Sequence, residues 1–156
     1  MKHSKIFLGC DHGGFELKEE IKSRLIKEGY QINDFGTHSK EAVDFPDFAF
    51  LVAQAVALNH KSDGEEAMGL VIDSIGQASA MVCNKVPGIR AAVAFNDFQV
   101  QSSRLHNDAN ILCLGGQTLG VGLAKHLIDL WLNTEYAGGR HQARLDKITA
   151  VEQRAH

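Results

Sequence analysis

Met68-Gly-Leu-Val-Ile-Asp-Ser-Ile-Gly-Gln-Ala-Ser-Ala-Met81 is the stretch of sequence that says most about the fold. Its first five residues form an apolar run that predicts a buried strand, and a glycine-containing turn and a helix follow directly. Such a turn points backbone N–H groups at whatever lies above the end of the strand, so it suits an anion or a developing oxyanion. Asp73 lies at the turn, where a carboxylate is either a candidate proton acceptor or a turn and helix-cap residue.

The composition is that of one soluble globular domain, residues 1–156, with 44% hydrophobic and 22% charged residues. The net charge of −3 gives no electrostatic case for nucleic acid or an anionic membrane as partner. No apolar run approaches the ~20 residues that span a bilayer, and residues 1–6 read as the entry to a strand rather than a signal peptide. The three cysteines, Cys10, Cys83 and Cys113, lack CxxC spacing and predict reduced thiols in a cytoplasmic protein.

Along the rest of the chain, short apolar runs alternate with helical patterns. The predicted strands are Lys5–Gly9, Tyr30–Phe35, Met68–Ile72, Ile89–Phe95 and Ile111–Leu114. Repeated strand–helix units with short connections predict an α/β fold, a three-layer α/β/α, Rossmann-like domain. Its five-stranded parallel sheet is expected to carry helices on both faces.

Some helical segments carry more specific expectations. Pro46 fits the first turn of a helix, and the apolar face of that helix is predicted to comprise Phe48, Leu51, Val52, Ala55 and Val56. The helix after the third strand is expected to run through about Lys85. A last, polar helix is predicted from Arg140 to about Arg154, and the polar stretch Asn59–Glu66 predicts a solvent loop.

In a sheet of this type, ligands bind beyond the carboxyl ends of the strands. Three polar segments are expected there: Cys10–Gly14, Asp73–Ala78 and Gly115–Gln117. Asp11 and His12 could orient a sugar hydroxyl and contact a phosphate, although Asp11 could instead cap the following helix. Cys10 is expected to be a small buried residue rather than a reactive thiol. No Gly-Lys-Ser/Thr and no GxGxxG occur at these turns, which disfavours nucleotide binding.

Two further polar groups lie in the second half of the chain. His106 could act as a general acid or could interact with a helix C-terminus, with Asn107 as the turn residue. Arg140 and Arg144 lie four residues apart on one helix face and could clamp a phosphate or form a solvated basic face. A metal site built from His12, His106 and His141 has no recognised ligand spacing, so we expect no metal and no other cofactor.

Six segments, spread from the first strand to the last helix, carry a family resemblance. They are Gly9-Cys-Asp-His-Gly-Gly-Phe-Glu-Leu-Lys18, Asp34-Phe-Gly-Thr37, Asp44-Phe-Pro-Asp47, Asn84-Lys-Val-Pro-Gly-Ile-Arg-Ala91, His106-Asn-Asp-Ala-Asn110 and Tyr136-Ala-Gly-Gly-Arg-His-Gln-Ala-Arg144. Through them the chain resembles the ribose-5-phosphate isomerase B family, which includes the galactose-6-phosphate isomerase subunits LacA and LacB. The resemblance implies an aldose–ketose isomerase acting on ribose 5-phosphate or a similar sugar phosphate, without a metal, at sites on the interface of a homodimer or homotetramer.

The resemblance also implies roles for individual residues. Asp11 and His12 would bind the sugar phosphate, and Arg140 and Arg144 would hold its phosphate group. His106 would assist ring opening, and Asn107 would contact the substrate. The turn formed by Ser74, Ile75, Gly76, Gln77 and Ala78 would donate N–H groups to the enediolate oxygen, because fixed dipoles stabilise that anion.

The chain departs from the family pattern at the turn after the third strand. Asp73 stands where many members have a catalytic cysteine, Ile75 where they have threonine, and Ala78 where they have a glycine. Gln117 stands where the family usually has a phosphate-contacting arginine, and Val-Ile-Asp-x-x-Gly resembles LacA. Two hypotheses follow. Either Asp73 is the base of an isomerase, or the chain is a LacA-like sugar-phosphate-binding subunit completed by a paralogous partner.

Overall fold

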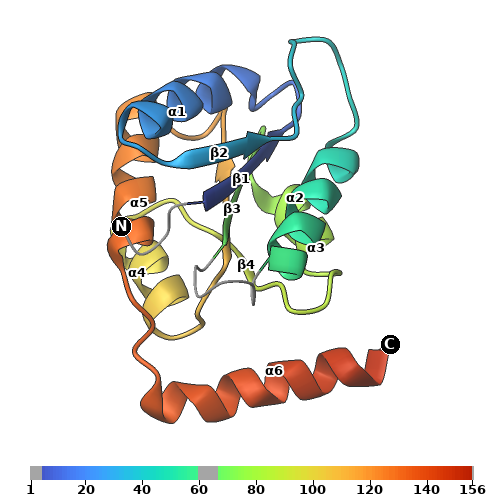
Figure 1. Ribbon diagram of the computed structural model, residues 1–156, viewed down its shortest axis with the longest axis vertical. Coiled ribbons are helices and arrows are strands. Elements are labelled where there is room, and N and C mark those ends of the chain that lie inside the picture. Colours follow the sequence, from blue (N-terminus) through green and yellow to red (C-terminus); the bar gives the residue numbers. More distant parts are fainter. Residues whose placement is uncertain (1–4, 60–66, 156) are drawn as a thin grey trace.

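The computed structural model describes residues 5–59 and 67–155, which form a five-stranded parallel sheet between two layers of helices (Figure 1). The strands are β1 (Lys5–Cys10), β2 (Gln31–Asp34), β3 (Met68–Asp73), β4 (Ala91–Val93) and β5 (Ile111–Gly115), in the spatial order β2-β1-β3-β5-β4. All four neighbouring pairs are parallel, and the central strand β3 is buried along its whole length. The predicted three-layer α/β/α class is confirmed.

The helices divide between the two faces of the sheet and one projecting arm. They are α1 (Phe15–Lys27), α2 (Phe45–Asn59), α3 (Gln77–Cys83), α4 (Asp97–Leu105), α5 (Val121–Asn133), the 3₁₀ turn η1 (Gly139–His141) and α6 (Gln142–Ala155). Helices α1, α4 and α5 share one apolar core with alternate strand residues such as Leu8, and α2 and α3 share the other with residues such as Phe7. Helix α6 extends past the end of the sheet instead of covering a face (Figure 1).

Helix α2 packs on the sheet through a face that coincides only in part with the one predicted, since Val52 and Val56 belong to both. Its buried residues are Ala49, Val52, Ala53 and Val56, whereas Leu51 is 40% exposed. The small alanines let the helix lie close to the sheet, and glycines on the strands take part in the same contact. A Cβ on Gly9 would lie 2.8 Å from Val52 Cγ2, so only glycine fits beneath this part of α2.

Several element boundaries also differ from the prediction. The edge strand β4 is three residues long, because only Ala91–Val93 pair with β5 and these residues are half-buried. Helix α3 ends at Cys83, and the expected terminal helix from Arg140 is divided into η1 and α6. The N-terminal entry, residues 1–4, and nearly all of the predicted 59–66 loop lie outside the described residues. Within the described ranges, no helix combines the length and apolar character needed to cross a membrane.

Candidate active site

The loops that follow β1, β3 and β5 meet at the carboxyl edge of the sheet, as predicted. A side chain at Gly13 would collide with the Ser74 hydroxyl, and one at Gly116 would collide with the carbonyl of Gly13. The N–H of Gln117 donates to the carbonyl of Ser74 at 3.0 Å. The two glycines therefore let three loops converge, and the predicted residues on these loops share one edge.

Asp73 forms the centre of the turn after β3. Its Oδ1 accepts from the N–H of Ile75 at 2.9 Å and from the N–H of Gly76. Its Oδ2 accepts from Ser79 twice, from the backbone N–H at 3.0 Å and from the hydroxyl at 2.6 Å. The side chain is buried, with 3% of its surface exposed. The carboxylate thus makes turn and helix-cap contacts with four donors of its own segment, two on each oxygen. A proton taken from a substrate would have to compete with these donors for the carboxylate oxygens.

Asp11 and His12 hold the loop after β1. The Asp11 Oδ1 accepts from the N–H of Gly14 at 3.0 Å, so Asp11 closes the turn before α1 instead of capping the helix itself, whose N-cap is Gly14. His12 is exposed, and its Nδ1 accepts from the N–H of Val43 at 3.2 Å. A neutral imidazole with Nδ1 as acceptor carries its proton on Nε2, so His12 can offer Nε2–H to an anion.

The three thiols do not supply a nucleophile in place of the family cysteine. All three are buried. Burial raises the pKa of Cys10 to about 12. The hydrogen bond with Cys83 and complete burial raise the pKa of Cys113 well above its ordinary value. Because the thiolate is the reactive form, Cys10 and Cys113 are unreactive at neutral pH, in agreement with the structural role expected for Cys10.

A second group of predicted residues gathers near the end of α4 and around η1. The ring of His106 stacks on that of His141, with centroids 4.4 Å apart and planes inclined by 18°. Arg144 Nη1 lies 3.4 Å from His141 Nδ1, and the N–H of Ala137 donates to the carbonyl of Leu105 at 3.0 Å. Burial and the charges of His106, Arg140 and Arg144 lower the pKa of His141. The group is cationic and suits an anion such as phosphate.

His141 is the member of this cationic group that the sequence did not predict as a substrate-binding residue. The sequence suggested it only as a possible metal ligand together with His12 and His106. In the structure His12 lies on the loop after β1, apart from the stacked pair, and no three His, Cys, Asp or Glu side chains of the described residues are arranged to hold a metal ion. Its position three residues before Arg144 was the available signal, because residues i and i+3 are neighbours on a helix. Asn107 lies in the turn after α4, as expected, and the residue with a left-handed conformation there is Asp108.

The two groups lie at opposite edges of the sheet. Near the start of β3, the N–H of Gly69 donates to the carbonyl of Asn110 at 2.9 Å. Near its end, the carbonyl of Ile72 accepts from the N–H of Asp11 at 3.3 Å. The six residues of β3 span roughly 17 Å at 3.3 Å per residue, and the packed core fills the space between. One chain therefore brings Asp11, His12, Asp73, Ser74 and Gln117 together at the carboxyl edge, and His106, Asn107, Arg140 and Arg144 near the amino edge.

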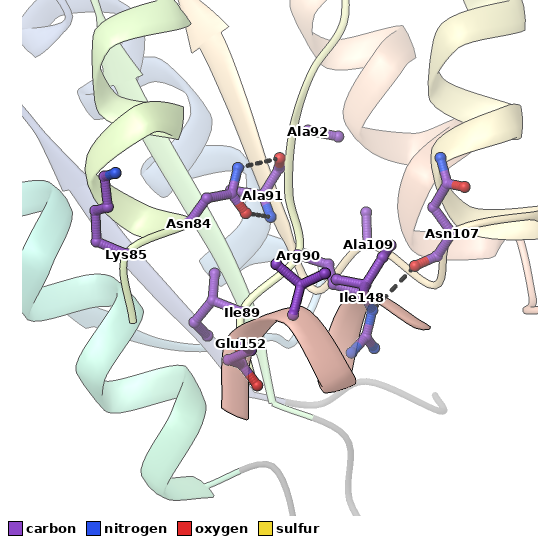
Figure 2. Close-up of a pocket in the computed structure, with 11 residues that line it drawn as sticks. Asn84, Lys85, Ile89, Arg90, Ala91, Ala92, Asn107, Ala109, Ile148 and Glu152 are labelled. Atoms are coloured by element: carbon purple, nitrogen blue, oxygen red, sulfur yellow. Dashed lines mark hydrogen bonds between the residues drawn. The ribbon is translucent and has the colours of Figure 1, made fainter. Parts of the chain in front are cut away.

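A cavity of approximately 790 Å³ opens at the amino edge, between α6 and the segment before β4 (Figure 2). Its lining includes Asn107 and the apolar side chains of Ile148 and Val151 from α6. Arg90 also lines it and donates through Nε to the carbonyl of Asn107 at 3.0 Å (Figure 2). The two α6 side chains are 50% and 64% exposed, respectively, so this wall of the cavity presents apolar surface.

Comparisons with known proteins agree with the fold. Residues 6–148 match the family model described as Ribose/Galactose Isomerase. Ribose-5-phosphate isomerase B of Escherichia coli (strain K12) is 45% identical over 150 residues, covering 96% of this chain and 97% of that protein. A solved ribose-5-phosphate isomerase B from Clostridium thermocellum superposes with a TM-score of 0.92 at 47% identity and covers 97% of this chain and 99% of that one. The Mycoplasma genitalium enzyme, solved with bound ribulose-5-phosphate, gives 0.90 at 35% identity, with 96% of each chain covered.

Proposed function

The chain belongs to the ribose/galactose isomerase family, and on that premise we propose that it interconverts an aldose phosphate and a ketose phosphate, with ribose 5-phosphate and ribulose 5-phosphate as the substrate pair. The observation that carries the proposal is the cationic group formed by His106, Arg140, His141 and Arg144. Two guanidinium groups beside two stacked imidazoles fit a phosphate. The sugar attached to that phosphate would extend toward the remaining site residues.

The residues near the amino edge have separate tasks in this reaction. Arg140 and Arg144 hold the phosphate, because each guanidinium can donate two parallel hydrogen bonds. His106 transfers a proton at the ring oxygen and so opens the sugar ring. Its stacked neighbour His141, whose pKa is lowered, stays neutral at neutral pH and adds no further charge beside His106. Asn107 contacts the sugar hydroxyls.

The residues at the carboxyl edge act on the open-chain sugar. His12 donates from Nε2 and Asp11 accepts from a hydroxyl group. Asp73 removes the proton next to the carbonyl group, and an enediolate forms. The N–H groups of Ile75 and Gly76 already donate to Asp73. The N–H groups of Gln77 and Ala78, which have no carbonyl four residues earlier within α3, are left for the enediolate oxygen.

Because the two groups lie at opposite edges of the sheet, the proposed site needs two chains. A second copy would bring its amino edge against the carboxyl edge of the first. Under a two-fold axis this arrangement repeats itself and gives two equal sites. A homodimer, or a homotetramer built from two such pairs, is therefore part of the proposal.

One observation favours a second candidate function. The Asp73 carboxylate is fully engaged by Ile75, Gly76 and Ser79, so removing a substrate proton would require it to give up hydrogen bonds inside a buried turn. In the second candidate, Asp73 only shapes the turn. The chain then binds a sugar phosphate, a six-carbon one if it is of the galactose-6-phosphate isomerase type, and a LacA-like partnership with a paralogous subunit supplies the proton acceptor.

Proton exchange separates the two candidates. The purified chain is incubated in D₂O with ribose 5-phosphate, and then with six-carbon aldose phosphates, while NMR follows deuterium at C2 of the aldose. An isomerase with Asp73 as base incorporates deuterium, and Asp73→Asn abolishes the exchange in a folded protein. The control Asp97→Asn makes the same change at an exposed position of α4 and should leave exchange intact.

The other outcomes are equally definite. Saturable binding of the sugar phosphate without any exchange supports the subunit function. Exchange that survives Asp73→Asn contradicts Asp73 as the base. If the chain neither binds any of these sugars nor exchanges their protons, both candidates are contradicted.

A further inference from the structure

A charged cluster near the amino edge holds the turn that carries His106 and Asn107. Asp108 follows them and adopts φ = +45°, a left-handed conformation that few residues other than glycine adopt. Each oxygen of its carboxylate binds one arginine. Arg104 Nη1 lies 2.9 Å from Oδ1, and Arg90 Nη2 lies 2.8 Å from Oδ2. We refer to Arg90, Arg104 and Asp108 as the Asp108 clamp.

The same two arginines also hold the main chain of the turn. Arg90 Nε donates to the carbonyls of Asn107 at 3.0 Å and Asp108 at 2.9 Å (Figure 2). Arg104 Nη1 donates to the carbonyl of Ala109 at 2.7 Å. Three consecutive carbonyls after His106 thus receive guanidinium N–H groups, and such charge-assisted bonds are stronger than neutral ones.

The clamp is anchored to the body of the protein on both sides. Arg104 is 2% exposed and donates through Nε to the carbonyl of Thr134 at 3.2 Å. Its Cζ lies 5.9 Å from the centroid of the Trp131 ring. Asn110 fixes Arg90 from the other side, since its Oδ1 accepts from the Arg90 N–H at 2.8 Å. The turn is therefore fixed relative to α5 and to the segment before β4.

We propose that Asp108 is a positioning residue, whose clamp with Arg90 and Arg104 fixes the turn that aims His106 and Asn107 at the substrate. This inference rests on the proposed function. Without the carboxylate, the two arginines lose their common partner and the left-handed residue is free to relax. The imidazole of His106 and the amide of Asn107 then move relative to the phosphate held by η1 and α6. A displacement of about 1 Å at a reacting group can lower a rate by about 100-fold.

Three substitutions separate the effect of the carboxylate from that of the backbone. Asp108→Gly keeps the left-handed conformation without strain and removes the clamp. Asp108→Asn tolerates that conformation and keeps one acceptor oxygen. Asp108→Ala loses both the conformation and the clamp. The matched control is Asp129→Asn, which breaks the ion pair of a half-exposed carboxylate on α5 with Arg24 of α1.

We expect kcat for sugar-phosphate isomerisation to fall by about 10- to 100-fold in Asp108→Gly and Asp108→Ala, and by less in Asp108→Asn. KM should stay within about threefold, because Arg140 and Arg144 still hold the phosphate. Asp129→Asn should match the wild-type protein. The proposal is overturned if Asp108→Gly keeps the wild-type kcat, or if the loss lies entirely in KM.

Two further measurements separate the proposal from folding and from the proposed function. Trp131, the only tryptophan, reports folding by its fluorescence. If the Asp108 variants do not fold, Arg90→Met replaces them: it opens the clamp at its partly exposed side, and the same fall in kcat is expected. If the wild-type chain exchanges no sugar, the proposed function fails by itself. The clamp is then tested by the imidazole NMR signals of His106, assigned by their absence in His106→Asn. They should shift in Asp108→Gly and not in Asp129→Asn, and unchanged signals in Asp108→Gly would contradict the proposal.

Discussion

Asp73→Asn should destabilise the protein because one carboxylate serves four buried donors. An asparagine presents one acceptor oxygen and one NH₂ group in the same space. If its oxygen faces the N–H groups of Ile75 and Gly76, its NH₂ group faces the N–H of Ser79, which then lacks an acceptor. The Ser79 hydroxyl can rotate and accept from that NH₂ group. The substitution thus leaves one buried N–H unpaired and turns the other three charge-assisted bonds into neutral ones.

The size of the effect follows from these changes. An unpaired buried N–H costs about 1–3 kcal/mol, and each weakened bond to the former carboxylate costs about 1 kcal/mol. The free energy of unfolding should therefore fall by about 5 kcal/mol. For a chain of this length, each kcal/mol lowers Tm by about 2–4 °C, so Tm should fall by roughly 10–20 °C.

Thermal unfolding followed by circular dichroism measures the shift at one protein concentration. Asp97→Asn is the control, because Asp97 is exposed and pairs with the exposed His126, and it should change the free energy of unfolding by less than about 0.5 kcal/mol. If Asp73→Asn melts within about 2 °C of the wild-type protein, the four hydrogen bonds do not stabilise the turn and the capping argument is wrong.

Two further predictions concern titration and thiol chemistry. Because the pKa of His141 is lowered in the folded state, the unfolded state binds a proton first as the pH falls through about 6.5. The free energy of unfolding, measured in urea, should therefore decrease from pH 7.5 to pH 5.5, and His141→Gln should reduce that decrease. An identical pH dependence in the variant and the wild-type protein would contradict the assignment. Because Cys10, Cys83 and Cys113 are all buried, a disulfide reagent should label them slowly in the native protein and rapidly in urea, and rapid native labelling would show that a thiol is accessible.

The sequence was sufficient to predict the sheet because most of its strands are marked by short apolar runs. Three of the five observed strands begin at the predicted residue, Lys5, Met68 and Ile111, where a polar segment gives way to an apolar run. The boundaries of β4 could not be found in this way, since Ile89 is apolar and buried in the same core without belonging to the strand. An apolar run shows which residues are buried, and pairing along an edge strand depends on the neighbouring strand.

Helix α2 illustrates a second limit. Nearly all of its residues are apolar, so its sequence fits more than one helical face. On the face that packs, Val52 and Val56 lie against Gly9 and Gly69, and these glycines lie on other elements. Contacts of this kind depend on residues far apart in the chain, as does the contact of Arg90 with Asp108.

The candidate site shows a third limit, in which the sequence contained information that the prediction did not use. Residue types and motifs identified nearly all of its members, but not their division between two edges. The division was implicit in the predicted topology, because a residue between a helix and the next strand lies at the amino edge of a parallel sheet. His106 precedes β5 and Arg140 follows α5, so both had to lie away from Asp73.

The separation of the two edges by the length of β3 also bears on how such a chain can evolve. If each site combines one edge of each partner, a mutation that removes the chemistry of one edge leaves the other edge able to serve a neighbour. After gene duplication, two diverging copies can therefore divide the work, each losing the edge that the other retains. Selection then acts on the pair. A substitution such as aspartate in place of cysteine at position 73, which lies at the carboxyl edge of one copy, abolishes the activity of the pair only when the partner has not kept its own carboxyl edge.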